Sequence, residues 1–104
     1  GLMPCFNPLN CVFFQKEFEN VDRTFELLVN IAQEIPRIKV LENNQSYWKG
    51  VCRSLIFRFP DDLEILKIGN KIQIKSASRY GVGDIGVNGT RVGRLLTDLE
   101  KLNS

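Results

Sequence analysis

The stretch that decides the fold is DLEILKIGNKIQIKS, residues 62 to 76. Apolar and polar residues alternate on both sides of Gly69-Asn70, a pair typical of a two-residue β-hairpin loop. A tight loop places Ile65 opposite Ile74 on one face of the hairpin, because successive side chains of a strand point to opposite faces. Glu64 and Lys75 then pair across the strands on the other face. The sequence therefore predicts an antiparallel hairpin with its Ile65–Ile74 face turned to the core.

Outward from the hairpin, the pattern predicts further strands and two helices. An apolar face at helical spacing begins near Val21 and ends before Pro36, which cannot continue a helix, and Asp22 is its expected N-cap. A last helix is expected after Asn88, which we take as its N-cap. The expected strands cover residues 11–15, 38–42, 46–59, 62–68 and 71–78, with a turn at Pro60-Asp61.

These elements follow in the order β-α-β-β-β-β-α. Consecutive strands with short turns predict a four-stranded antiparallel meander, to which residues 11–15 add a short N-terminal strand. Each helix has one apolar stripe, which must be covered. The fold class is therefore α+β, a two-layer domain with both helices on one face of the sheet. The expected strand 46–59 carries apolar residues on both faces, so we expect residues 1–20 to cover the second face; a ligand, a subunit or a membrane surface are the alternatives.

Length and composition narrow the possible functions. The chain has 104 residues and a formal net charge of +2, so we expect a single domain, residues 1–104, with an irregular segment over residues 1–10. It contains no histidine, which excludes histidine-dependent catalysis and leads us to expect no metal site and no cofactor. No apolar run approaches the ~18 residues that span a bilayer.

Three cysteines are present, Cys5, Cys11 and Cys52. We expect all three to be reduced and partly buried, because free cysteine behaves as a small apolar residue. The alternative is a Cys5–Cys11 disulfide in an oxidising compartment. Localisation stays open between cytoplasmic and membrane-peripheral or extracytoplasmic, and membrane association through an N-terminus that precedes Gly1 is a further alternative.

The segment Gly81-Val82-Gly83-Asp84-Ile85-Gly86 reads G-x-G-x-x-G before a helix. A dinucleotide site needs a further strand after that helix. The sequence pattern predicts no such strand, so we expect no dinucleotide. The glycines either shape a tight connection or present amide groups to an anion. Bases outnumber acids six to one from Lys67 to Arg94, which favours an anionic partner for this part of the chain. The net charge of the whole chain is too small to indicate nucleic acid.

Five ordered motifs resemble the uncharacterised family called domain of unknown function 1499. They are Asn10-Cys11-Val12, Arg53-Ser54 with Phe59, Asp61-Asp62-Leu63-Glu64, Ser76-Ala77-Ser78-Arg79-Tyr80-Gly81, and Asp84-Ile85-Gly86-Val87-Asn88 with Arg91-Val92. Phe13-Phe14 replace the family's paired serines, and Lys75 replaces an arginine. The resemblance implies a small domain without an established activity.

The resemblance also implies which polar residues act together. The candidate ligand-binding or polar-network residues are Arg53, Ser54, Asp61, Asp62, Glu64, Ser76, Ser78, Arg79, Asp84, Asn88 and Arg91. We expect them to form a buried or half-buried network between the long strand, the hairpin and the loop that follows it. No residue is assigned as catalytic.

Two classes of function fit these residues. We expect a non-enzymatic binding module for a small anionic or amphipathic ligand or a protein partner. In that hypothesis Arg53, Arg79 and Arg91 supply charge, and Tyr47, Trp48 and Phe57 supply apolar area, on the sheet face and the glycine-rich loop. The alternatives are a carboxylate-dependent enzyme, with Asp62 or Glu64 as base and Arg79 as electrophile, and a weak nucleic-acid binder.

Overall fold

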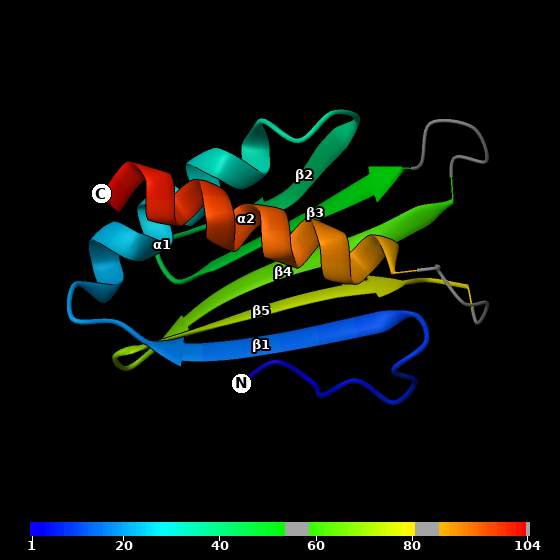
Figure 1. Ribbon diagram of the computed structural model, residues 1–104, viewed down its shortest axis with the longest axis horizontal. Coiled ribbons are helices and arrows are strands. Elements are labelled where there is room, and N and C mark those ends of the chain that lie inside the picture. The colour runs from blue at the N-terminus through cyan, green and yellow to red at the C-terminus, as the bar shows by residue number, and fades with distance from the viewer. Residues whose placement is uncertain (54–58, 81–85, 104) are drawn as a thin grey trace.

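Two helices lie on one face of a five-stranded antiparallel sheet (Figure 1). The computed structural model describes residues 1–53, 59–80 and 86–103. Its elements are β1 (Cys11–Glu17), α1 (Val21–Gln33), β2 (Ile38–Asn43), β3 (Tyr47–Arg53), β4 (Pro60–Ile68), β5 (Lys71–Ser78) and α2 (Val87–Asn103). The α+β class, the element order and the placement of both helices on one face are therefore confirmed.

The strands are arranged in the order β1-β5-β4-β3-β2, so the N-terminal strand completes the sheet beside β5. The predicted hairpin register is confirmed: Ile65 pairs with Ile74, and Glu64 pairs with Lys75. We call the helix-covered side of the sheet the core face and the opposite side the outer face. Phe14 of β1 pairs with Ile74 of β5, so the core face of the hairpin continues onto β1.

The helix ends differ from the expected ones. Asn20, and not Asp22, caps α1, because its side chain accepts a hydrogen bond from the backbone N–H of Arg23. Both residue types cap helices well, and only the backbone path selects between them. Asn88 does not cap α2: the helix begins at Val87, and the Asn88 side chain is fully buried against the sheet.

The expected turn at Pro60-Asp61 is wrong. Pro60 is the first residue of β4 and lies opposite Arg53, the last residue of β3. The first residue of a strand tolerates the missing proline N–H. Residues 54–58 of the expected strand 46–59 lie outside the described residues.

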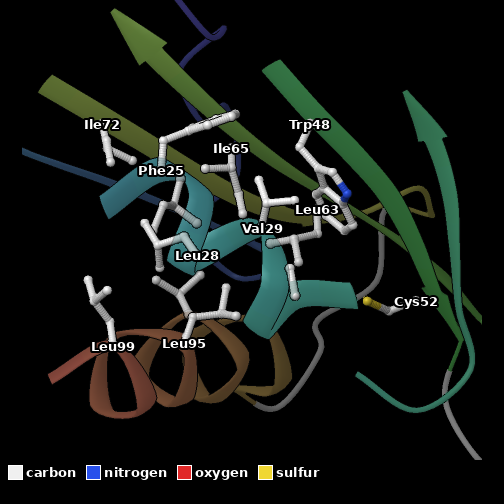
Figure 2. Close-up of a cluster of buried hydrophobic side chains, with 13 residues drawn as sticks. Phe25, Leu28, Val29, Trp48, Cys52, Leu63, Ile65, Ile72, Leu95 and Leu99 are labelled. Atoms are coloured by element: carbon white, nitrogen blue, oxygen red, sulfur yellow. The ribbon is translucent and has the colours of Figure 1, made fainter. Parts of the chain in front are cut away.

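The core lies between the helices and the sheet (Figure 2). Leu28 of α1 and Leu95 of α2 lie in one buried cluster with the strand residues Ile65 and Trp48 (Figure 2). Gly50 gives Trp48 its space, because a Cβ atom at Gly50 would stand 2.6 Å from the Trp48 ring.

The N-terminal segment is held to the sheet by a disulfide between Cys5 and Cys11. The expectation that all three cysteines are reduced is therefore wrong, and only Cys52 is a free, buried thiol. Leu2 N–H also donates to Gln73 Oε1 on the outer face of β5, at 2.8 Å. This contact brings the start of the chain, but not the whole of residues 1–20, onto the second face of the sheet. Among the described residues, no helix is long and apolar enough to cross a membrane.

Candidate functional site

A buried polar network lies where the first turns of α2 meet β4 and β5. Asn88 is fully buried at its centre. Its Nδ2 donates to the backbone oxygen of Asn10 at 3.1 Å and to Ser78 Oγ at 3.2 Å. Its Oδ1 accepts hydrogen bonds from Ser76 Oγ and from Arg91 Nη1. One amide side chain therefore joins α2 to β5 and to the residue before β1.

Arg91 brings a positive charge into this network. Its Nη1 donates to Ser76 Oγ at 3.0 Å and to Asn88 Oδ1 at 2.8 Å. Its Nη2 lies 3.1 Å from Asp61 Oδ2, and the side chains of Arg91 and Asp61 are 13% and 7% exposed. An almost buried ion pair is tolerated when hydrogen bonds also satisfy its donors, as the Ser76 and Asn88 side chains do here. Arg91 is therefore held in one orientation.

Asn10 belongs to the network, although the sequence reasoning did not include it among the candidate residues. Its backbone oxygen accepts from Asn88 Nδ2 and from Ser78 N–H, and its own Nδ2 donates to the backbone oxygen of Tyr80 at 3.2 Å. Its position in the motif Asn10-Cys11-Val12 was the only sequence signal. Because the backbone oxygen of Asn10 accepts two of these hydrogen bonds, they could not be predicted from the type of its side chain.

A second polar group lies on the outer face of the sheet, away from the helices. Arg79 Nε and Nη2 donate to both carboxylate oxygens of Asp62 at 3.0 to 3.1 Å. These hydrogen bonds and the charge of Asp62 raise the pKa of Arg79. Tyr47 Oη donates to Glu64 Oε2 at 2.7 Å. Burial first, and then the hydrogen bond and charge of Glu64, raise the pKa of Tyr47 above its ordinary value.

The expected single network is therefore two groups on opposite faces of the sheet. Asp61, Ser76, Ser78, Asn88 and Arg91 come together on the core face. Asp62, Glu64 and Arg79 do not join them, because neighbouring residues of a strand point to opposite faces. Ser54 and Asp84, together with Phe57 and the glycine-rich loop 81–85, lie outside the described residues.

Two further candidates have other roles. Arg53 is exposed at the end of β3, where its backbone oxygen accepts from Arg37 Nε at 3.1 Å. Trp48 is fully buried in the core, so it cannot offer apolar area to a ligand.

Cys52 lies beside the network, because it pairs with Asp61 between β3 and β4. Burial raises the pKa of its thiol. Over residues 1–53, 59–80 and 86–103, no cluster of acidic and cysteine side chains is suited to hold a metal ion.

A groove of about 700 Å³ lies between the end of α1 and the length of α2. We call it the α1–α2 groove. Its volume is within the range of small-molecule sites, roughly 300–1,000 Å³. Its apolar wall is formed by Ile31, Ile35, Pro36, Val87, Leu95 and Leu102. Its charged residues are Glu34, Arg91, Arg94, Asp98 and Lys101. Arg91 is thus the one described network residue that also lines the groove.

This groove could not be predicted from the sequence. It depends on the distance between α1 and α2, which no sequence motif determines. Arg94 and Lys101 have no motif of their own and read as ordinary solvated residues of a helix. The excess of bases from Lys67 to Arg94 was the only signal for Arg94, and Lys101 lies outside that segment.

Comparison with known proteins identifies the family but not the activity. The family model described as protein of unknown function (DUF1499) matches residues 2–99. The chain therefore belongs to this family, as the five motifs indicated. A search of curated proteins gave no match.

Proposed function

We propose that this member of the DUF1499 family is a non-enzymatic binding module whose α1–α2 groove takes an amphipathic ligand with an anionic group. The observation that carries the proposal is the combination of an apolar wall with three basic side chains, Arg91, Arg94 and Lys101, in one groove. An apolar pocket with a few convergent polar groups is the usual form of a small-molecule site.

The groove has basic side chains that can take an anion. Arg94 and Lys101 equal Glu34 and Asp98 in number, and Arg91, whose charge is paired with Asp61, adds a guanidinium group to them. Arg91 is already oriented by Asp61, Ser76 and Asn88, so a ligand would not have to immobilise it. A guanidinium group binds carboxylate or phosphate oxygens in two-pronged geometry. The groove therefore suits a short acyl chain or other apolar body that ends in such a group.

The carboxylate-enzyme alternative has less support. Asp62 and Glu64 lie on the outer face of the sheet, and each accepts a hydrogen bond, from Arg79 and Tyr47 respectively. Neither lines the α1–α2 groove. A base whose lone pairs are engaged by an arginine or a tyrosine is poorly placed to accept a proton from a substrate.

The experiment is a displacement titration with anilinonaphthalene sulfonate, a fluorescent probe that is both apolar and anionic. Decanoate should displace the probe more strongly than decanol, which has a similar chain without the charge. Arg94→Glu reverses a charge in the groove and should weaken probe binding by about 5-fold or more. Leu102→Asp should also weaken it, because Leu102 is 53% exposed along the apolar wall.

Two control variants lie outside the groove. Arg23→Glu reverses a charge in the first turn of α1, and Ile68→Asp places a charge at the hairpin tip. Both should leave probe affinity unchanged. Equal affinity in Arg94→Glu, Leu102→Asp and the controls would overturn the proposal, as would equal displacement by decanol and decanoate.

A further inference from the structure

Exposed apolar side chains gather at one end of the sheet. Phe6 is 82% exposed, Leu9 71%, Tyr80 57% and Phe59 49%. They precede β1, follow β5 and precede β4, and these strand ends share one end of the sheet (Figure 1). We call these four residues the apolar end. Large exposed side chains concentrated in this way mark an interaction site more often than scattered ones do.

The apolar end is tied together by covalent and polar contacts. The Cys5–Cys11 disulfide closes the loop that carries Phe6 and Leu9. The Asn10 backbone oxygen accepts a hydrogen bond from Ser78 N–H at 2.9 Å, and Asn10 Nδ2 donates to the Tyr80 backbone oxygen at 3.2 Å. The rings of Phe59 and Tyr80 meet edge to face, with centroids 6.1 Å apart. The exposed side chains are therefore presented from a fixed framework, which lowers the entropy cost of docking.

Basic residues surround the apolar end. Arg37 and Arg53 are exposed and in contact where β2 begins and β3 ends, since Arg37 Nε donates to the Arg53 backbone oxygen. Arg79 is exposed at the end of β5. The two acidic residues at the start of β4, Asp61 and Asp62, are each paired with an arginine. Arg79 balances Asp62 and Arg91 balances Asp61. Among the described residues of these strand ends, the excess positive charge therefore comes from Arg37 and Arg53.

We propose that the apolar end docks on the surface of a membrane that contains anionic phospholipid. Aromatic side chains are favoured at the boundary between headgroups and acyl chains, and apolar side chains on short loops can enter it. Arginines beside them are attracted to anionic headgroups. The apolar residues stand on separate connections rather than in one groove, which suits a soft surface better than a shaped protein partner. This inference does not depend on the α1–α2 groove.

Sedimentation with vesicles of phosphatidylcholine, with and without phosphatidylserine, tests the proposal. The chain should bind the vesicles that contain phosphatidylserine and should be released as salt is raised. Phe6→Asp should weaken binding by about 10-fold or more, because it removes an apolar side chain that would be buried on docking. Arg37→Gln should reduce the preference for phosphatidylserine.

Ile68→Asp is the matched control. Ile68 is an apolar residue, 43% exposed, at the hairpin tip on the opposite end of the sheet. This variant should bind vesicles as the unmodified chain does, and circular dichroism should confirm that all the variants are folded. Absence of vesicle binding, or equal loss in Phe6→Asp and Ile68→Asp, would overturn the proposal; absence of binding would leave a protein as the partner of this end.

Discussion

Replacing Asn88 by alanine tests whether the buried network holds α2 on the sheet. The substitution removes the four hydrogen bonds that the Asn88 side chain makes with the described residues Asn10, Ser78, Ser76 and Arg91. Each contributes on the order of 1 kcal/mol, and the contact with a charged arginine contributes more. We therefore expect the free energy of unfolding to fall by about 4 kcal/mol, a large part of the ~5–15 kcal/mol of a typical domain.

Urea unfolding followed by tryptophan fluorescence measures this loss, since Trp48 is the only tryptophan in the chain. The thermal midpoint should fall by about 15 to 30 °C. Thr97→Ala is the control on the same helix: the Thr97 hydroxyl donates only to the Gly93 backbone oxygen at an exposed position. Its effect should stay within about 0.5 kcal/mol.

A double-mutant cycle then tests whether the network acts as a unit. Ser76→Ala should cost less in the Asn88→Ala background than in the unmodified chain, because the two side chains share a hydrogen bond. A loss below about 1 kcal/mol for Asn88→Ala, or strictly additive effects in the cycle, would refute the reasoning.

Three further predictions concern the core, the outer face and the cysteines. Gly50→Ala should lower the free energy of unfolding by about 1–3 kcal/mol, because its Cβ would stand 2.6 Å from the Trp48 ring; an unchanged urea midpoint would contradict this packing. Tyr47 has a raised pKa in the folded state, so the part of the stability that depends on Tyr47 should be constant below pH ~10 and fall above it. Tyr47→Phe should remove that part of the fall, and an unchanged alkaline slope would count against it. A thiol reagent should label Cys52 only on unfolding, whereas Cys5 and Cys11 should require a reductant as well; three thiols in the unreduced, unfolded chain would contradict the disulfide.

The hairpin could be predicted to the residue because two independent signals agree. The Gly69-Asn70 loop fixes the register, and the alternation of apolar residues fixes which face is buried, so the Ile65–Ile74 pair follows from the sequence alone. The helix caps could not be predicted as firmly. Asn20 and Asp22 are both good capping residues two positions apart, and the packing of α1 on the sheet decides between them.

The candidate site was predicted in composition but not in arrangement. Most residues of the core-face network were among the polar candidates that the sequence motifs indicated. Its separation from Asp62 and Arg79 follows from the two-residue period of β4 and β5, which the motif spacing hides. The Cys5–Cys11 disulfide and the α1–α2 groove depend on distances between segments, which no local pattern determines.

The most direct test of the proposed function is a nitrogen–proton correlation spectrum of the chain recorded during titration with decanoate. The account predicts that amide signals around the α1–α2 groove shift together and saturate, among them those of Ile31, Arg94 and Leu102. Amides on the outer face, such as those of Asp62 and Lys75, should stay in place. Saturable shifts centred on the outer face, or no saturable shifts at all, would contradict it.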